Sequence, residues 1–404
     1  MVNVAILGFG TVGSGVAEVL TGHEDSISRK LNDFIKLKYI LDVRDFPDSP
    51  FADRFVKDFS IIESDPEVDI VVETIGGAGV ALDFTRRALE AGKSVVTSNK
   101  ELVAAHGYDL LQLAKSRKVS YLFEASVGGG IPIIRPLSQC LAANDILEIY
   151  GILNGTTNYI LTRMIRAGLP FEAALKEAQD NGYAERDPSA DIEGYDACRK
   201  ICILSAIAFG RHVYPEQVPT EGITGVTLAD VDYAEAAGKK IKLLGRAKRM
   251  DDGRICAYVA PHLLDSSHPL AGVDDVFNGI SVRGDAIGDV MFYGRGAGKL
   301  PTASAVVGDV IDAAKHNDSR KYLEWAPGGP DVVCPLEALK SNWYVRAEAS
   351  ADELRQALGS VKLLARSGSA TGEAACLTEE AMSREELDRK LSGIQWRSVF
   401  RLLN

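Results

Sequence analysis

The stretch Val2-Asn3-Val4-Ala5-Ile6-Leu7-Gly8-Phe9-Gly10-Thr11-Val12-Gly13 decides the fold of the N-terminal third of this 404-residue chain. Its apolar start predicts a buried β-strand, and the Gly-x-Gly-x-x-Gly turn that follows leads into residues with helical spacing. Glycines at these positions let the backbone approach a pyrophosphate, which binds at the positive end of the following helix. The motif alone is weak evidence, but its place between a strand and a helix predicts a dinucleotide-binding domain.

The rest of the N-terminal third alternates short apolar runs with segments of helical periodicity. This alternation is typical of a doubly wound parallel sheet with helices on both faces, the Rossmann type of α/β fold. The predicted strands are residues 4–7, 37–43, 69–74, 94–97 and 119–123, and the predicted helices are residues 13–20, 81–91 and 108–115.

A second pattern begins after Gly128-Gly129-Gly130-Ile131-Pro132. A predicted helix near residues 133–143 and a strand at 146–153 precede a long helical region that ends at Arg166. Two pairs of antiparallel strands follow, so we predict an α+β domain with a mainly antiparallel sheet. The paired strands are residues 243–249 with 255–263, and residues 279–283 with 289–293.

The last part of the chain has strand and helix patterns in the order β-α-β-β-α-β, which is typical of a small ferredoxin-like module. The Pro- and Gly-rich stretch Trp325-Ala326-Pro327-Gly328-Gly329-Pro330 predicts a linker before it. Further upstream, a helix is predicted at residues 300–315, after a second glycine-rich loop, Gly294-Arg295-Gly296-Ala297-Gly298. The six elements of the module are residues 343–349, 351–357, 361–366, 374–377, 384–391 and 398–402.

Composition narrows the class of protein. The formal net charge of −11 and the lack of a Lys/Arg block predict no nucleic-acid partner, because neutralising phosphates needs a concentrated basic face. No segment approaches the ~18–20 uninterrupted apolar residues of a membrane span, so no membrane partner is expected. The six cysteines form no Cys-x-x-Cys pair, and Met1 leads directly into a core strand, so we expect a reduced, cytoplasmic protein.

Two lysines are candidate catalytic residues. Lys100 follows Thr97-Ser98-Asn99 at the end of a predicted strand, and doubly wound folds bind ligands at the carboxyl edge of the sheet. Lys200 follows Asp196 by four residues, so the two side chains share a helix face and can orient each other. A helix-capping cluster at Lys100 and an ordinary surface ion pair at Lys200 are the structural alternatives.

An acidic loop precedes Lys200. Its carboxylates would repel one another unless cationic groups gather there, so the sequence predicts that the loop binds an amine. A solvated loop is the alternative. The acidic residues are Glu185, Asp187, Asp191 and Glu193.

The end of the second predicted strand carries both Asp42 and Arg44. An acid at this position binds ribose hydroxyls and favours NAD, whereas an arginine can bind the 2′-phosphate of NADP. With both residues present, the sequence leaves the choice of cofactor open. We predict NADP because of Arg44, with NAD as the alternative; Arg44 as a solvated charge is the structural alternative.

Together these elements resemble homoserine dehydrogenase over nearly all of the chain before the predicted linker. The resemblance depends on several separated motifs, which no other family that we considered combines. The motifs are Gly8–Gly13, Thr97–Lys100, Phe123-Glu124-Ala125-Ser126-Val127-Gly128-Gly129-Gly130-Ile131-Pro132, Gly151-Ile152-Leu153-Asn154-Gly155-Thr156-Thr157-Asn158-Tyr159-Ile160, Gly182–Lys200, and Gly294–Gly298 with Pro301-Thr302-Ala303-Ser304-Ala305-Val306.

The resemblance implies reversible hydride transfer between L-homoserine and L-aspartate 4-semialdehyde with NAD(P), in the biosynthesis of threonine and methionine. It implies that Glu185 binds the substrate ammonium with help from Asp191. Lys200 would donate and accept the proton, with Lys100 as its electrostatic partner and Asp196 orienting it. Desolvation or the charge of the second lysine would lower the pKa of Lys200. The other implied substrate-binding residues are Gly155, Thr156, Gly182 and Tyr183, and the implied cofactor-binding residues are Gly8, Phe9, Gly10, Thr11, Val12, Gly13, Arg44, Ser98, Lys100 and Gly298.

A structural Na⁺ or K⁺ near the hinge is also implied by the resemblance. The segment with Glu124, Val127, Gly129 and Ile131 would bind it, mainly through backbone carbonyls, with the Glu124 carboxylate as an additional ligand. The alternative is that Glu124 is an acid that stabilises the hinge.

The C-terminal module resembles an ACT domain, the amino-acid-sensing fold. Ala349-Ser350-Ala351-Asp352-Glu353-Leu354 replaces the usual Asp-x-Pro-Gly-Val-Leu of that family, so threonine feedback is not expected and the module is expected to serve assembly. We expect a homodimer or homotetramer. The predicted division is 1–134 with 298–318 for nucleotide binding, 135–297 for substrate binding and dimerisation, 319–340 as linker, and 341–404 as the ACT-like module.

Three rival classes fit the sequence less well. Lysine-using sugar dehydrogenases usually carry Glu-Lys-Pro where this chain has Asn99-Lys100-Glu101. An aspartate-semialdehyde dehydrogenase needs a cysteine nucleophile in a loop between domains, whereas Cys140 lies in a predicted helix. A non-catalytic metabolite sensor predicts loss of Lys100 or Lys200, and both are present.

Overall fold

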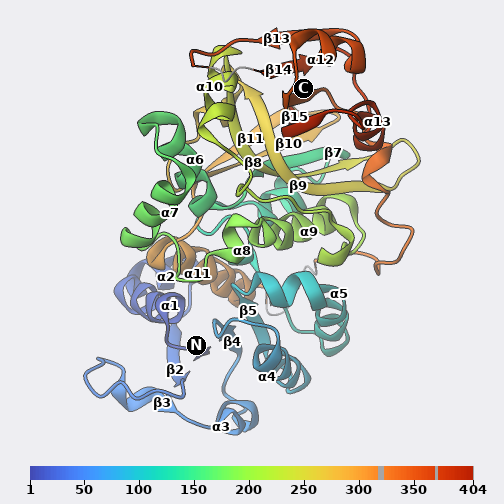
Figure 1. The fold of residues 1–404 in the computed structure, drawn as a ribbon. Coiled ribbons are helices and arrows are strands. Elements are labelled where there is room, and N and C mark those ends of the chain that lie inside the picture. The colour runs from blue at the N-terminus through green and yellow to red at the C-terminus, as the bar shows by residue number, and fades with distance from the viewer. Residues whose placement is uncertain (317–322, 369–371, 404) are drawn as a thin grey trace. The chain divides into compact units, whose positions relative to one another are not determined.

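A computed structural model describes residues 1–316, 323–368 and 372–403 (Figure 1). The chain folds into two compact units, and each unit combines segments that are distant in the sequence. Unit 1 comprises Met1–Asp145, Cys202–Pro215 and Gly294–Gly329, and unit 2 comprises Ile146–Ile201, Glu216–Tyr293 and Pro330–Asn404.

Among its described residues, unit 1 contains a six-stranded parallel sheet in the order β3-β2-β1-β4-β5-β6. This is the strand order of the dinucleotide-binding fold, in which the ligand crevice lies where the order reverses, here between β1 and β4. The predicted doubly wound sheet is therefore confirmed. Its strands are β1 Val2–Leu7, β2 Ile35–Leu41, β3 Phe55–Val56, β4 Ile70–Glu73, β5 Ser94–Thr97 and β6 Tyr121–Leu122.

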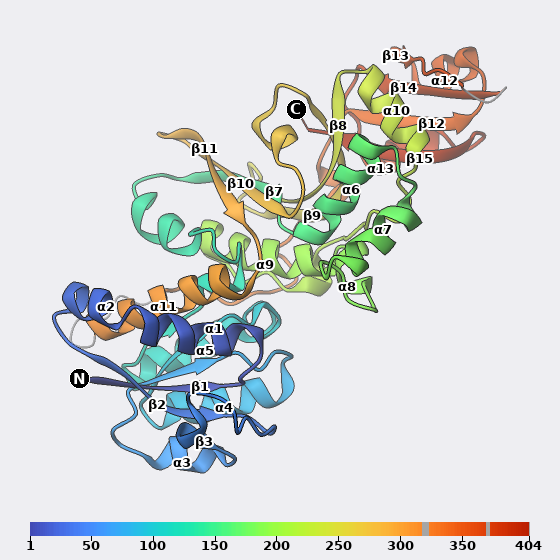
Figure 2. The ribbon, with the colours of Figure 1, turned by 90° about the vertical axis from the view of Figure 1, so that its left-hand side faces the viewer.

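Helices cover both faces of this sheet (Figure 2). The apolar sides of α1, α2 and α11 form one core with the strands, in which Val16, Leu20, Val306 and Val310 are buried. The helices that connect β4 to β5 and β5 to β6, α4 and α5, pack together, and α3 contacts α4. The bounds are α1 Thr11–Gly22, α2 Glu24–Leu31, α3 Phe59–Ser64, α4 Gly79–Glu90, α5 Lys100–Arg117 and α11 Lys299–Lys315.

Two predicted helices of this unit differ from the structure. The helix predicted at residues 108–115 begins at Lys100, because Asn99 caps it and the carbonyl oxygen of its side chain accepts from Leu102 N at 3.1 Å. The helix predicted at 133–143 is a shorter π-helical turn at Pro136–Cys140. Its first residue, Pro136, has no N–H to donate to the preceding turn.

Unit 2 is organised around a mixed sheet, which in its described residues has nine strands in the order β11-β10-β7-β8-β9-β15-β12-β14-β13. The antiparallel pair of β8 with β9 was predicted, and the structure adds antiparallel pairs of β7 with β10 and of β7 with β8. The strands of this part are β7 Ile146–Ile152, β8 Lys239–Arg249, β9 Ile255–Asp265, β10 Phe277–Gly284 and β11 Gly288–Arg295. The helices are α6 Gly155–Ala167, α7 Phe171–Asp180, α8 Ser189–Ile192, α10 Leu228–Ala236 and the first part of α9 Tyr195–Phe209, which belongs to unit 1 from Cys202 on.

The C-terminal segment has the predicted β-α-β-β-α-β sequence of elements. Its strands lie in the order β15-β12-β14-β13, which is the ferredoxin-like arrangement, but β15 also pairs in parallel with β9 and so extends the sheet of unit 2. The sequence did not reveal this shared sheet. The elements are β12 Trp343–Glu348, α12 Ala351–Leu358, β13 Val361–Leu364, β14 Glu373–Thr378, α13 Arg384–Lys390 and β15 Gln395–Leu402.

Residues 319–322 of the predicted linker lie outside the described residues, and a few apolar residues of the remainder are buried. Trp325 is buried, and its indole N–H donates to His212 Nδ1 at 3.1 Å. Further on, Cys334 is buried and its backbone N–H donates to Ile255 O at 2.9 Å. The described part of this stretch is therefore held by hydrogen bonds and apolar burial.

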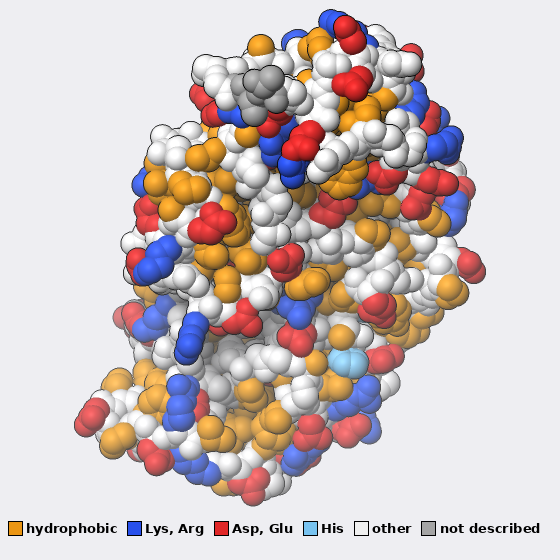
Figure 3. All heavy atoms as spheres, viewed as in Figure 1, with side chains coloured by type: hydrophobic (Ala, Val, Ile, Leu, Met, Phe, Trp, Pro, Cys, Tyr) orange, Lys and Arg blue, Asp and Glu red, His pale blue; other side chains and the backbone are white. Residues whose placement is uncertain are grey.

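Charged side chains of both signs are interspersed on the face of the molecule in Figure 3. Within residues 1–316, 323–368 and 372–403, no helix is long and apolar enough to cross a membrane.

Candidate active site

The glycine-rich turn lies at the carboxyl end of β1, in unit 1. Gly8 has a φ of +90°, and a Cβ on Gly13 would lie 1.9 Å from Gly8 O, so both positions require glycine. The N-cap of α1 is Gly10, which brings no side chain over the first N–H groups of the helix. Thr74 holds the turn from β4, since its hydroxyl lies 2.9 Å from both Leu7 O and Gly8 O. The turn therefore fits a pyrophosphate at the helix N-terminus.

Asp42 and Arg44, which were predicted to discriminate between the cofactors, form an ion pair just after β2. The Asp42 carboxylate accepts from Phe9 N at 2.7 Å and from Arg44 N at 2.9 Å. The Arg44 guanidinium donates to both carboxylate oxygens, at 3.1 and 3.0 Å, and this lowers the pKa of Asp42 to about 2. Nevertheless, the Arg44 side chain is 60% exposed. A hollow of about 600 Å³ beside the glycine turn is lined in part by Phe9, Phe46 and Lys299.

Lys100 is the first residue of α5, directly after the carboxyl end of β5. It therefore lies at the edge of the sheet where the sequence predicted it, with Ser98 in the connecting turn. Gly298, another predicted cofactor residue, is the N-cap of α11 and has a φ of +127°. The sequence assigned no role to Glu73, which ends β4 and accepts from the Thr97 hydroxyl at 2.6 Å.

In unit 2, a buried cluster surrounds Lys200 on α9. Its ammonium donates to Asp196 Oδ2 and to Leu153 O, both at 2.7 Å. Asn154 donates from its amide to Asp196 Oδ2 at 2.8 Å and to Asp191 Oδ1 at 2.6 Å. The predicted pairing of Lys200 with Asp196 is thus present, and Asn154 joins it to Asp191.

The sequence analysis assigned no role to Asn154, although its position as a helix N-cap was a signal. Asn154 precedes the helical run of α6, and its side-chain oxygen accepts from Thr157 N at 2.8 Å as an N-cap. Its amide then faces the two carboxylates. Burial, followed by the nearby charge of Asp196, raises the pKa of Asp191 above its ordinary value.

The other predicted substrate residues lie on the start of α6 and in the segment after α7. A Cβ on Gly155 would lie 2.8 Å from Val276 O, so this position is restricted to glycine. The Thr156 hydroxyl donates to Tyr183 O at 2.7 Å and joins the two segments. Gly182 has a φ of +72°, and Glu185 is exposed and is not part of the Lys200 set of hydrogen bonds.

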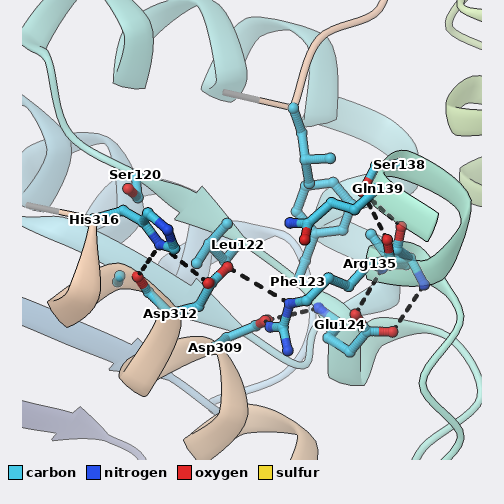
Figure 4. Close-up of a pocket in the computed structure, with 13 residues that line it drawn as sticks. Ser120, Leu122, Phe123, Glu124, Arg135, Ser138, Gln139, Asp309, Asp312 and His316 are labelled. Carbon is cyan, nitrogen blue, oxygen red and sulfur yellow. Dashed lines mark hydrogen bonds and ion pairs between the residues drawn. The ribbon is translucent and has the colours of Figure 1, made fainter. Parts of the chain in front are cut away.

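The candidate cation segment lies in unit 1. Figure 4 shows Glu124, its first residue, next to Arg135. The Glu124 carboxylate accepts from the backbone N–H groups of Ile133, Ile134 and Arg135 at 2.6, 2.8 and 2.8 Å. The Glu124 side chain therefore fixes the backbone of residues 133–135, as an acid with a structural role would. Gly129 has a φ of +57°, and Val127 and Ile131 are buried. Among the described residues, no group of three or more His, Cys, Asp or Glu side chains could hold a metal ion.

A Rossmann sheet with a glycine-rich turn between its first strand and helix is typical of NAD(P)-dependent oxidoreductases, and the comparisons assign the chain to that class. Residues 8–124 match the model of the homoserine dehydrogenase NAD-binding domain, and residues 132–311 match the homoserine dehydrogenase model. The chain belongs to the homoserine dehydrogenase family, which acts on homoserine and aspartate semialdehyde. The resemblance inferred from the motifs is therefore confirmed.

Homoserine dehydrogenases from other organisms match this chain over most of their own length. The homoserine dehydrogenase of Synechocystis sp. is 46% identical over 366 residues, which cover 85% of this chain and 82% of the relative. That of Neisseria gonorrhoeae is 42% identical over 357 residues, which cover 86% of this chain and 82% of the relative. The crystal structure of the enzyme from Thiobacillus denitrificans has a TM-score of 0.90 at 34% identity, covering 100% of this chain and 98% of that one. A hyperthermophilic archaeal homoserine dehydrogenase in complex with NADPH has a TM-score of 0.68 at 29% identity, covering 80% of this chain and 99% of that one.

Proposed function

We propose that Lys200 moves the proton of the reacting oxygen and that Lys100 stabilises the charge on that oxygen. In homoserine oxidation, neutral Lys200 takes the proton of the substrate hydroxyl as C4 loses a hydride. In the reverse direction, the Lys200 ammonium returns a proton to the aldehyde oxygen. The nicotinamide, when bound, supplies the hydride acceptor or donor. The observation that carries this proposal is the buried Lys200 ammonium, whose position is set by Asp196 and Leu153 O at 2.7 Å each.

The electrostatics of the cluster support these roles. A positioned acid or base typically contributes about 10²–10⁴-fold to a rate. Asp196 orients the lysine and balances its charge when it is protonated, and a cationic Lys100 would disfavour a second ammonium and so lower the pKa of Lys200. Together the two lysines stabilise the alkoxide charge that develops on the substrate oxygen.

For the substrate amine, we propose Glu185 as the principal partner, with help from Asp191. Asp191 is a half-buried carboxylate near Asp196, and a bound ammonium would offset the repulsion between them. The link from Thr156 to Tyr183 O supports a shared pocket, because it joins α6 to the segment that carries Gly182 and Glu185. Gly155 completes this pocket, where a larger residue would meet Val276 O.

For the cofactor, we propose a preference for NADP. Arg44 is anchored by Asp42 yet has an exposed side chain, which suits it to a 2′-phosphate. Asp42 is already occupied by Arg44 and Phe9 N, which weakens it as an acceptor for ribose hydroxyls. The likeness to a relative solved with NADPH adds support.

Three further proposals concern cations, assembly and location. Na⁺ or K⁺ would bind to the backbone carbonyls of Glu124, Val127, Gly129 and Ile131.

The C-terminal segment would be a degenerate ACT-like module that serves assembly, since Glu353 accepts from Ser350 N at 2.7 Å and closes the turn where ACT domains hold effectors. We expect a homodimer or homotetramer and a cytoplasmic location.

The test is homoserine-dependent reduction of NAD and NADP, followed by absorbance, for the wild type, Lys200→Ala and Glu185→Ala. We expect kcat to collapse in Lys200→Ala and KM for homoserine to rise in Glu185→Ala. The control is Glu172→Ala on α7, an exposed glutamate outside the proposed site. Wild-type kcat in folded Lys200→Ala would refute the proton-transfer role.

A further inference from the structure

Glu73 is a buried carboxylate at the carboxyl end of β4, next to the point where the strand order of the sheet reverses. One of its oxygens accepts from Ile75 N at 2.7 Å and from Gly76 N at 3.4 Å. The other accepts from the Thr97 hydroxyl at 2.6 Å. The side chain is 0% exposed, and a buried carboxylate is costly unless it is hydrogen-bonded, so its presence here calls for a role beyond filling space.

Thr97 extends these hydrogen bonds to the start of α5. Its hydroxyl oxygen accepts from Asn99 N at 2.9 Å. The Asn99 amide then donates to Gly77 O at 2.6 Å, while its oxygen caps α5 through Leu102 N. Glu73, Thr97 and Asn99 therefore close a ring of hydrogen bonds between the loop after β4 and the turn that ends at Lys100.

The same loop also reaches the glycine-rich turn. Thr74, the neighbour of Glu73, donates from its hydroxyl to Leu7 O or Gly8 O, both 2.9 Å away. The short segment from Glu73 to Gly77 thus connects the pyrophosphate turn on one side with the N-terminus of α5 on the other. A shift of this segment would move both.

We propose that Glu73 is a positioning residue, which sets Lys100 at the edge of the sheet through Thr97 and Asn99. This inference goes beyond the proposed function but rests on the role proposed there for Lys100. Burial raises the pKa of Glu73, opposed by the hydrogen bonds from Thr97 and the backbone, which favour the charged form. The Glu73 carboxylate accepts from three donors. In Glu73→Gln, the side-chain amide would place its own N–H group against the Ile75 N–H or the Thr97 hydroxyl.

The test is a double-mutant cycle between Glu73→Gln and Lys100→Ala, with kcat for homoserine oxidation measured at saturating substrate and cofactor. A displacement of about 1 Å can cost up to about 100-fold in rate, and we expect Glu73→Gln to lower kcat at least about tenfold in the wild type. In the Lys100→Ala background the same change should lower kcat less than about twofold, because the lysine it positions is gone. KM for homoserine should stay within about twofold, since the residues proposed to bind it lie in unit 2.

Glu90→Gln, an exposed glutamate on α4, is the matched control. Thr97→Val, which removes the hydroxyl but keeps the shape, serves as the second variant if Glu73→Gln does not fold. It should reproduce the loss and its dependence on Lys100, and Thr97→Ser, which retains the hydroxyl, should restore most of kcat.

Equal losses in both backgrounds would overturn the inference, because Glu73 would then act independently of Lys100. An unchanged kcat in Glu73→Gln, or in Thr97→Val where that variant replaces it, would overturn it too. Full activity of Lys100→Ala would instead refute the proposed role of Lys100, and the inference with it. The single Lys100 variant therefore distinguishes failure of the proposed function from failure of the inference alone.

Discussion

The two candidate lysines are held by different means. Lys200 is positioned by its own ammonium, which donates to Asp196 and to Leu153 O within unit 2. Lys100 begins a helix in unit 1, and the hydrogen bonds of Glu73, Thr97 and Asn99 fix the backbone from which it projects. Direct side-chain contacts suit a group that exchanges a proton at a defined atom. The backbone at Lys100 is thus fixed by the side chains of neighbouring residues.

The largest effect should come from Lys200→Arg. Arginine keeps the positive charge and can still pair with Asp196, but it does not lose its proton in the working pH range. We expect kcat to fall about 10²–10⁴-fold. The measurement is steady-state homoserine oxidation, with circular dichroism to verify the fold. A loss below about threefold would mean that charge alone suffices at position 200, and the contrast with Lys100 would disappear.

Asp196→Asn should have a smaller effect on rate and a characteristic effect on pH dependence. The amide can still accept from Lys200 but carries no charge, so the Lys200 ammonium becomes less stable and its pKa falls. Because oxidation needs neutral Lys200, the rising limb of kcat against pH should move to lower pH, with kcat reduced about tenfold. A rising limb that stays in place would argue against control of Lys200 by Asp196.

Arg44→Ala tests the cofactor edge of unit 1. Loss of a charge-assisted contact to a phosphate should raise KM for NADP about tenfold or more. KM for NAD, which lacks the 2′-phosphate, should change less than about twofold. Equal changes in KM for NADP and NAD would mean that Arg44 supports the structure of the site through its ion pair with Asp42 and does not bind the 2′-phosphate.

Removal of monovalent cations should slightly lower thermal stability, because the proposed cation site lies in unit 1. Exchange of Na⁺ and K⁺ for tetramethylammonium removes a ligand that would bind only the folded state, so the midpoint of thermal unfolding should fall by about 2 °C. Differential scanning calorimetry at constant ionic strength makes the comparison. An unchanged midpoint over a titration of both cations would refute the proposed site.

The smallest expected effect concerns Asp42. Its folded-state pKa of about 2 lies below its ordinary value of 3.8, so its stabilising contribution is present above about pH 4 and is lost as the pH falls toward 2. The difference in unfolding midpoint between wild type and Asp42→Asn should therefore shrink over that interval. A difference that is independent of pH would show that the ion pair with Arg44 does not contribute to stability.

Local patterns were enough to predict the Rossmann sheet, the antiparallel strands, the β-α-β-β-α-β order and the pairing of Lys200 with Asp196. Each depends on periodicity or on spacing within one element, which a single sequence displays. The early start of α5 was missed because the cap signal of Asn99 was not applied, although the buried residues Leu102, Val103 and Ala104 follow it. Asn154 could have been found by the same cap rule, whereas Glu73 gave no local signal.

By itself, the sequence determined the class of the chain, its family and the identity of the candidate residues, because motifs and periodicity are local properties. Only the tertiary structure decided which groups that are distant in the sequence touch. It joined Glu73 to Thr97 across 24 positions, Asn154 to Asp196 across 42, and β15 to β9 in one sheet. Such contacts follow from the pairing of distant strands and from the need of buried polar groups for partners, and neither appears in the order of residues along the chain.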